Sequence, residues 1–261
     1  MADFLTAIVA HKREILTRKK DYFAALIKKA YELPPPASAL FRQRICRPGP
    51  MNLIAEIKKA SPSAGIIRVD FDVTKIARIY AEHGAAALSV LTEDKYFFGA
   101  PEHIKEASSA VELPVLTKDF IIDEAQICEA RLNGAQAVLL IAAILSDAQL
   151  KGLIKSAREL GLDTLVEVHD EKELDRAIKC GAATIGVNNR DLKTLEVNLK
   201  ICLGLIPRIP QGKVIVAESG ISTNDDVRRL KDLGAHAVLI GEPFMRAKDI
   251  GRKIEETMHG R

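Results

Sequence analysis

Eight short apolar runs, each followed by a helical pattern, limit the fold of this chain more than any other feature of the sequence. Each run is predicted to be a strand, and the runs cover residues 53–57, 86–91, 114–117, 137–141, 164–168, 184–187, 214–217 and 237–240. Alternation of strand and helix implies right-handed crossovers and a parallel sheet. Eight such units can close on themselves, so the pattern predicts an α/β fold, the (β/α)8 TIM barrel.

An internal repeat supports closure of this sheet. The strings H-G-A-A-A-L-S-V, N-G-A-Q-A-V-L-L, C-G-A-A-T-I-G-V and L-G-A-H-A-V-L-I begin at His83, Asn133, Cys180 and Leu233. Their spacing of roughly 50 residues corresponds to two strand–helix units. The glycine of each string stands where a helix is expected to end in a left-handed C-cap. A doubly wound open sheet is the competing architecture, but no G-x-G-x-x-G follows the first strand, and eight regular units exceed what that fold usually needs.

The length of the chain, 261 residues, fits one barrel, which typically needs about 250 residues. The first predicted strand begins only after residue 50. Residues 1–50 are therefore expected to form an N-terminal helical extension and residues 51–261 the barrel, together a single domain. Hydrophobic residues make up 48% of the chain and aromatic residues 5%, a composition that suits a large aliphatic core.

The charge balance argues against a nucleic-acid or membrane partner. The chain has 38 basic and 35 acidic residues, a formal net charge of +3, which gives no general field for either surface. No run of about 20 apolar residues and no signal peptide are present, so a cytoplasmic protein is expected. The basic stretch between Lys12 and Lys29 has helical spacing and is interpreted as the solvated face of an amphipathic helix, with a phosphate- or RNA-binding face as the alternative.

The cysteines predict neither a disulfide framework nor a zinc site. Cys46, Cys128, Cys180 and Cys202 lie far apart, with no C-x-x-C pair and no histidine at a ligand spacing. We expect all four to be reduced packing residues.

Charged residues stand where a barrel places its chemistry, at the C-terminal ends of its strands. The first strand ends in I-A-E-I-K-K-A-S-P-S with Glu56 and Lys58, two residues apart and hence on one face of the pleat. Burying two charges side by side is costly unless they pair or meet a ligand. Later strands end with Lys118, Glu167, Asn188, Arg190, Glu218 and Ser219. Any one of these residues fits a structural salt bridge or a solvated strand end, but together they predict one active-site mouth.

Two glycine-containing loops predict a phosphate site at this mouth. S-G-I-S, with Gly220, follows the seventh strand, and I-G-E-P-F, with Gly241 and Glu242, follows the eighth. Glycine allows close backbone approach, and Pro243 suits the first turn of a short helix. Ser61, just beyond the first strand, is a further candidate.

These strings closely resemble the indole-3-glycerol phosphate synthase family, the barrel enzymes of tryptophan biosynthesis that close the indole ring. The resemblance covers nearly the whole chain through I-A-E-I-K-K-A-S-P-S, L-S-V-L-T-E-D-K-Y-F-F-G, L-T-K-D-F-I-I-D-E-A-Q-I, L-V-E-V-H-D, I-G-V-N-N-R-D-L, V-A-E-S-G-I-S and L-I-G-E-P-F-M. It implies a carboxy-lyase that converts 1-(o-carboxyphenylamino)-1-deoxyribulose 5-phosphate to indole-3-glycerol phosphate with release of CO2 and water. It implies a phosphosugar substrate, no metal or organic cofactor, and room for weak association with other tryptophan-pathway enzymes.

The resemblance also implies roles for single residues. Lys118 would be the general acid at the substrate carbonyl, and Glu167 would stabilise or deprotonate the cationic intermediate. Lys58 would contact the anthranilate carboxylate, with Glu56 as its partner base. The division of acid steps between the two lysines stays open. The other matched positions are Asn188, Arg190, Glu218 and Ser219 for orientation, Phe97 for the anthranilate ring, and Ser61, Gly220, Gly241 and Glu242 for the phosphate.

Two residues of these motifs call for separate interpretation. Glu242 departs from family members with serine at this position, and because its carboxylate would repel a phosphate, we expect its backbone N–H to serve. His169 is interpreted as a loop residue without a chemical role.

Two rival functions fit parts of this pattern. Another phosphosugar barrel, such as phosphoribosylanthranilate isomerase, would share the final loops but would not need Glu56, Lys58, Lys118 and Glu167 together. A catalytically silent barrel that serves as a binding scaffold predicts losses among those four residues, and all four are present.

Overall fold

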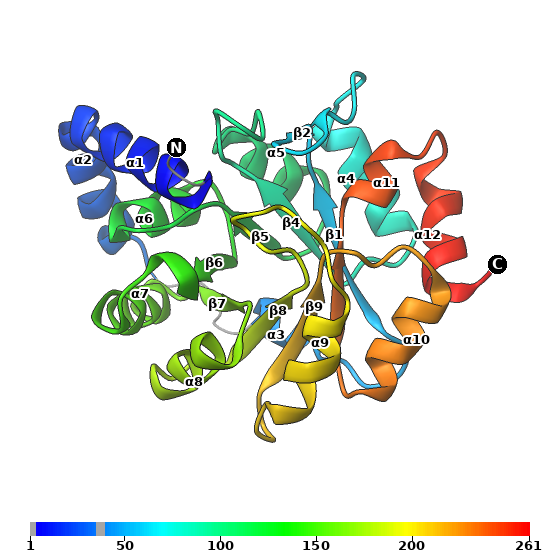
Figure 1. The fold of residues 1–261 in the computed structure, drawn as a ribbon. Coiled ribbons are helices and arrows are strands. Elements are labelled where there is room, and N and C mark those ends of the chain that lie inside the picture. The colour runs from blue at the N-terminus through cyan, green and yellow to red at the C-terminus, as the bar shows by residue number, and fades with distance from the viewer. Residues whose placement is uncertain (1–3, 35–39) are drawn as a thin grey trace.

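The computed structural model of the chain describes residues 4–34 and 40–261, in which eight parallel strands close into a barrel (Figure 1). Around the barrel the strands follow the order β1-β10-β9-β8-β7-β6-β5-β4. Their bounds are Asn52–Ile57 (β1), Ala87–Leu91 (β4), Val115–Lys118 (β5), Ala137–Ile141 (β6), Asp163–Val168 (β7), Thr184–Asn188 (β8), Val214–Glu218 (β9) and Ala237–Ile240 (β10). The predicted TIM barrel is therefore confirmed.

The eight predicted strands lie within one residue of the observed bounds at each end. The shift at β5 has a simple cause, because Pro114 has no N–H to donate to the ladder and the strand begins at Val115. Two further strands, β2 (Ala60–Ser61) and β3 (Gly65–Ile66), were not predicted from the sequence. They form an antiparallel hairpin in the loop after β1.

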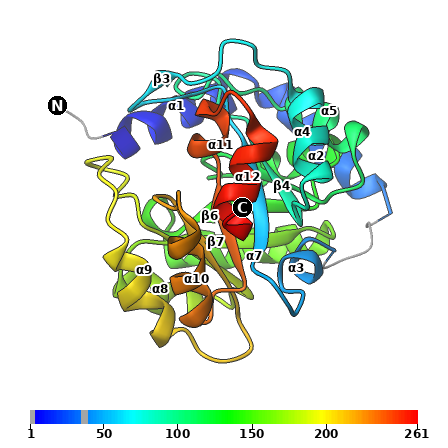
Figure 2. The same cartoon turned by 90° about the vertical axis from the view of Figure 1, so that its right-hand side faces the viewer.

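Helices surround the barrel and return the chain from one strand to the next (Figure 1). Their bounds are Val73–Glu82 (α4), Glu102–Ala110 (α5), Glu124–Leu132 (α6), Asp147–Glu159 (α7), Glu171–Lys179 (α8), Lys200–Leu205 (α9), Asn224–Asp232 (α10), Glu242–Arg246 (α11) and Ile250–His259 (α12), with 3-10 turns η1 (Ala142–Ile144) and η2 (Ile206–Arg208). Helix α12 packs against α10, α11 and α4 and closes the ring (Figure 2).

Local signals set the ends of these helices. Side chains such as Asp123, Ser146 and Thr223 accept a backbone N–H at the helix N-termini. The glycines of the four repeats take the left-handed conformation expected of them, with φ of 79°, 92°, 89° and 98°. The repeat in the sequence is therefore a repeated way of ending a helix and entering a strand.

Among the described residues before the first strand, the chain forms three helices: α1 (Phe4–Arg18), α2 (Lys20–Glu32) and α3 (Leu40–Ile45). Helix α3 contacts β1, β4 and β7, and its Arg42 N–H donates to Asp163 at the start of β7 (2.9 Å), so α3 lies at the bottom of the barrel. Helix α1 lies at the opposite end, where the Phe4 ring packs on Tyr96 and Phe120.

The basic stretch of this extension is exposed, as predicted, with one exception. Arg13, Lys20 and Lys28 face solvent, but Lys12 is buried and its Nζ lies 2.7 Å from Asp119 Oδ1. Asp119 directly follows β5, so Lys12 ties the extension to the mouth of the barrel. No helix in the described part of the chain combines the length and apolar character needed to cross a bilayer.

Candidate active site

The barrel interior places the polar site residues directly above apolar ones. Successive side chains of a strand point to opposite faces, so a residue two positions beyond an inward core residue also points inward. Such pairs are Ile54 and Glu56, Leu116 and Lys118, Leu165 and Glu167, and Val216 and Glu218. The lower member of each pair is buried in the core, and the upper member lines a cavity of about 390 Å³ at the C-terminal ends of the strands.

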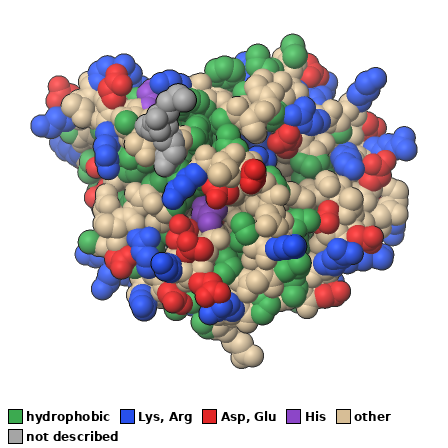
Figure 3. Space-filling view, viewed as in Figure 1, with side chains coloured by type: hydrophobic (Ala, Val, Ile, Leu, Met, Phe, Trp, Pro, Cys, Tyr) green, Lys and Arg blue, Asp and Glu red, His purple; other side chains and the backbone are tan. Residues whose placement is uncertain are grey.

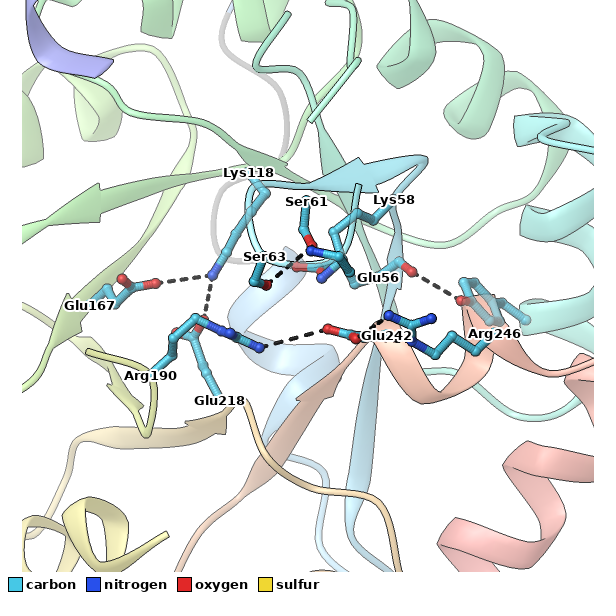
Figure 4. Close-up of polar contacts among 12 residues, drawn as sticks. Glu56, Lys58, Ser61, Ser63, Lys118, Glu167, Arg190, Glu218, Glu242 and Arg246 are labelled. Atoms are coloured by element: carbon cyan, nitrogen blue, oxygen red, sulfur yellow. Dashed lines mark hydrogen bonds and ion pairs between the residues drawn. The ribbon is translucent and has the colours of Figure 1, made fainter. Parts of the chain in front are cut away.

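Lys118 is the centre of the charged cluster (Figure 4). Its Nζ donates to Glu167 Oε2 (3.0 Å) and to Glu218 Oε2 (2.5 Å), and the side chains of both carboxylates are at most 2% exposed. Burial alone would lower the pKa of Lys118, but the negative charges of Glu167, Glu218 and Glu56 raise it above its ordinary value. Lys118 is therefore protonated at neutral pH. It can donate a proton to a substrate group that takes the place of one of its two carboxylate partners.

The two carboxyl groups beside Lys118 differ in their affinity for a proton. Burial would raise the pKa of Glu167, but the charge of Lys118 and the contact with His169 lower it well below its usual range. Burial raises the pKa of Glu218 to about 7, with the charge of Glu167 adding to the effect and Lys118 opposing it. Two neighbouring titratable groups whose pKa values are shifted in opposite directions by their environments are typical of acid–base sites.

Glu56 and Lys58 form a second pair in the same cavity. The Nζ of Lys58 donates to Glu56 Oε1 at 2.5 Å, as the two-residue spacing predicts. The Tyr80 hydroxyl fixes the strand beneath them by donating to the Glu56 carbonyl (2.9 Å). Gly241 leaves room for the Glu56 side chain, because a Cβ there would lie 2.8 Å from Glu56 Cβ.

One end of the cavity is basic and has sharply turned backbone. Ser219 and Gly220 both have positive φ, 64° and 74°, and a Cβ on Gly220 would lie 2.5 Å from Val197 Cγ1. The Glu242 carboxylate lies 2.9 Å from Arg246 and 3.7 Å from Arg190 (Figure 4). Pairing with two arginines offsets the repulsion expected between this carboxylate and an anion.

An apolar wall completes the cavity. Phe97 and Phe120 pack with ring centroids 6.2 Å apart, beside Leu91 and Ile141. The buried carboxylate of Glu93 shapes the loop that presents Phe97, since it accepts the backbone N–H groups of residues 95, 96 and 97. Such a surface suits a flat aromatic ring.

Twelve of the thirteen site residues singled out in the sequence line this cavity. Ser61 does not; its buried hydroxyl accepts the Ala64 N–H (3.3 Å) and lies 3.5 Å from Ser63 Oγ within its own loop. The short helix expected after Gly241 is α11.

Sequence reasoning missed three residues that shape the site, Glu93, Asp119 and Arg246, and assigned no role to a fourth, His169. Glu93 follows β4 and could have been found by the same search for charged strand ends. Asp119 adjoins Lys118, and its carboxylate accepts the Thr92 hydroxyl (2.7 Å) besides pairing with Lys12. His169, interpreted as a loop residue without a role, lies with its Nε2 3.3 Å from Glu167 Oε1.

Comparison with known proteins shows the family of this chain. The family model described as indole-3-glycerol phosphate synthase matches residues 5–257. The chain belongs to the indole-3-glycerol phosphate synthase family. The indole-3-glycerol phosphate synthase of Acetivibrio thermocellus is 53% identical over 208 residues, 80% of each chain. That of Polaromonas sp. (strain JS666) is 46% identical over 255 residues, 96% of each chain.

Solved structures outside the indole-3-glycerol phosphate synthase family share the fold. The tryptophan synthase α-subunit of Pyrococcus furiosus superposes with a TM-score of 0.61 at 16% identity, covering 80% of this chain and 98% of its own. The 3-hexulose-6-phosphate synthase of Salmonella typhimurium gives 0.62 at 14% identity, covering 78% and 95%. At these identities the likeness establishes the barrel alone.

Proposed function

We propose that this chain carries out the reaction of its family at the mouth of the barrel. That reaction is the ring closure, decarboxylation and dehydration of 1-(o-carboxyphenylamino)-1-deoxyribulose 5-phosphate to indole-3-glycerol phosphate. The observation that carries the proposal is Lys118 held between Glu167 and Glu218 in a cavity that also contains the Glu56–Lys58 pair.

The cavity is polarised in the way that this substrate requires. We assign the phosphate to the basic end, with Arg190 and the backbone of Gly220, Gly241 and Glu242, where glycine permits close approach. The anthranilate ring packs on Phe97 in this arrangement, and its carboxylate meets Lys58. Asn188 orients the loop that carries Arg190, because its Oδ1 accepts the Arg190 N–H (2.9 Å). The Ser61 hydroxyl remains a candidate only if its loop moves.

Ring closure is assigned to Lys118 and Glu167. The aromatic carbon that bears the carboxylate attacks the carbonyl carbon, and the displaced electron pair on oxygen takes the proton of Lys118. The ionised carboxylate of Glu167 stabilises the positive charge that develops on the ring and nitrogen. Breaking the bond to the carboxylate then releases CO2, and its electron pair restores the aromatic ring.

Dehydration is assigned to Lys58 and Glu56, with Glu218 as an acceptor within reach. The new hydroxyl leaves as water with a proton from Lys58. A carboxylate removes the proton from the neighbouring carbon, and the double bond of the five-membered ring forms between these two carbons. The 2.5 Å contact between Lys58 and Glu56 supplies a donor and an acceptor side by side.

The decisive experiment supplies the carboxyphenylamino-deoxyribulose phosphate and follows indole fluorescence. No signal at high enzyme concentration would exclude the proposed reaction. Lys118→Ala is expected to lower kcat by about 10²-fold or more, the usual scale for a positioned acid. Lys193→Ala, at an exposed loop position, is the control and should retain wild-type turnover. Wild-type kcat in Lys118→Ala would remove the role assigned to Lys118.

We further propose a cytoplasmic location and weak association with other tryptophan-pathway enzymes. The interspersed acidic and basic side chains on the face seen in Figure 3 support this proposal. Size-exclusion chromatography of the purified chain mixed with such an enzyme tests the second part, and a stable joint peak at micromolar concentration would contradict it.

A further inference from the structure

The His169 ring lies between two carboxylates just behind the charged cluster. Its Nε2 is 3.3 Å from Glu167 Oε1, and its Nδ1 is 3.0 Å from Glu173 Oε2. The other oxygen of Glu167, Oε2, accepts the hydrogen bond that Lys118 Nζ donates. The two oxygens of Glu167 are thus divided between a lysine that faces the cavity and a histidine that lies behind it.

Of the two ring contacts, that of Nδ1 with Glu173 is a hydrogen bond, whereas Nε2 and Glu167 Oε1 lie 3.3 Å apart without a hydrogen-bond partner, a pairing that is favourable when the ring is an imidazolium. A neutral imidazole has one N–H and one acceptor nitrogen, so it can donate to only one of two ionised carboxylates. An imidazolium donates from both nitrogens. The His169 side chain is 13% exposed, and although burial lowers its pKa, the two carboxylates raise it to about 10.

The chain after β7 holds the ring in place by local bonds. Glu173 Oε2 also accepts the backbone N–H of His169 (2.8 Å), and the Asp170 carboxylate accepts the backbone N–H of Glu173 (2.8 Å) at the start of α8. The backbone of Glu173, in the first turn of α8, is therefore held by Asp170, and its side chain is held by the backbone N–H of His169. The Glu173 side chain is 15% exposed and does not line the cavity.

We propose that His169 is a positioning residue that acts through Glu167: the imidazolium, anchored by Glu173, keeps Glu167 ionised and turns Glu167 Oε2 toward Lys118 and the substrate. The inference rests on the proposed function, in which Glu167 stabilises the cationic intermediate. His169 makes no contact with the cavity in the described structure, since it is absent from the residues that line it. Its effect on the reaction passes through the Glu167 carboxylate, with which it forms a buried ion pair.

The charged groups around this relay come from four elements. Lys118 of β5 and Glu218 of β9 face Glu167, and Glu56 of β1 acts on both Lys118 and Glu218. Asp191, in the loop after β8, lies close enough for its charge to interact with His169. Loss of the imidazolium removes a positive charge beside Glu167 and leaves the neighbouring Glu218 in a more negative setting. Both carboxyl groups are then expected to take up protons at higher pH than in the wild type.

The test compares His169→Gln, His169→Ala and Glu173→Gln by steady-state kinetics from pH 5.5 to 9. We expect kcat to fall roughly tenfold in His169→Ala, less than for a directly acting acid or base, with KM within about twofold. The acidic limb of the kcat profile should move to higher pH in all three variants. Glu173→Gln keeps an oxygen for the His169 backbone N–H and so protects against misfolding. His259→Gln, at an exposed position, is the matched control.

A second measurement needs no turnover. ¹⁵N spectra of the histidine rings in the unliganded protein, assigned by the signal lost in His169→Gln, should show both His169 nitrogens protonated at pH 8. A neutral ring at that pH would overturn the proposal, and so would an unmoved kcat profile in folded His169→Gln and Glu173→Gln. Failure of the wild type to form indole would instead overturn the proposed function, while the ring spectra would still decide whether the relay exists.

Discussion

Replacing Gly186 by alanine is expected to abolish most activity while leaving the fold intact. Gly186 points inward from β8, and a Cβ there would overlap Glu218 Oε1 and lie 3.3 Å from Glu218 Cδ. Reaching an ordinary separation of about 3.5 Å requires the carboxylate oxygen to retreat by about 1.4 Å. That movement breaks the 2.5 Å contact with Lys118. A misplacement of about 1 Å in a catalytic constellation costs about 10²-fold in rate.

The same substitution should change stability little, for two reasons. The added methyl group displaces the end of the Glu218 side chain beside an open cavity and meets Leu165 Cδ1, the end of a second side chain, at 3.2 Å. Glu218, with a pKa of about 7, can also become neutral when its partner is lost. Alanine also favours a strand interior by roughly 0.5–1 kcal/mol over glycine. The net change should stay within about 1 kcal/mol, a shift in Tm of about 2–4 °C.

The assay measures kcat by indole fluorescence and Tm by circular dichroism on the same preparations. Gly152→Ala is the matched control, because Gly152 lies in α7 with nothing within 4 Å of its added Cβ. It should keep wild-type kcat and gain up to about 1 kcal/mol of stability. Wild-type kcat in Gly186→Ala would refute the reasoning, since the position of the Glu218 carboxylate would then be unimportant for turnover.

Three further predictions concern the extension, the phosphate end and the pH dependence of stability. Lys12→Met leaves Asp119 without its cation and should lower the free energy of unfolding by about 3 kcal/mol in urea titrations, whereas the exposed Lys28→Met should change it by less than about 0.5 kcal/mol; equal effects would contradict the buried pair. Glu242→Gln removes a negative charge beside the proposed phosphate site and should lower the inhibition constant of inorganic phosphate by roughly threefold, while an unchanged or higher constant would show that the carboxylate does not face the anion. The pKa of His169 is raised from 6.5 to about 10, so its contribution to stability is complete below pH 6.5 and is lost as pH rises toward 10. The unfolding free energies of wild type and His169→Gln should therefore converge by up to about 1.4 kcal/mol per pH unit in this window, and parallel curves would count against a charged ring.

Most of the barrel and its central residues could be predicted because they depend on local periodicity. Strand alternation alone places Glu56 above Ile54 and Glu167 above Leu165, and the spacing of the strands then brings those side chains together. The prediction that Ser61 lines the cavity was less accurate. The direction of its hydroxyl depends on the path of the loop, which forms the unpredicted hairpin β2–β3. Periodicity sets the direction of a side chain on a strand and gives little information in a loop.

Asp119 was missed because its role depends on packing between separate elements, the helix α1 and the loop after β5. Helical spacing shows which residues of α1 share a face, but it cannot show that the loop after β5 covers Lys12. His169 was interpreted as a loop residue without a role, and that interpretation did not take account of Glu173, which lies four residues away and contacts the ring. An acidic residue in the first turn of a predicted helix is a common helix-start signal. The four-residue spacing of Glu173 from His169 could have indicated the contact between the two side chains.

The barrel interior has a lower layer of apolar residues that stabilises the fold and an upper layer of polar residues that takes part in the reaction. A side chain such as Glu218 stands on Val216, and replacing the upper residue leaves the packed layer below it in place. Selection can therefore exchange the upper layer, and with it the chemistry, while the lower layer continues to specify the same barrel. The converse also holds: enlarging or shrinking Val216 would tilt the group above it, so the rate of this enzyme can be tuned by apolar residues that never meet the substrate.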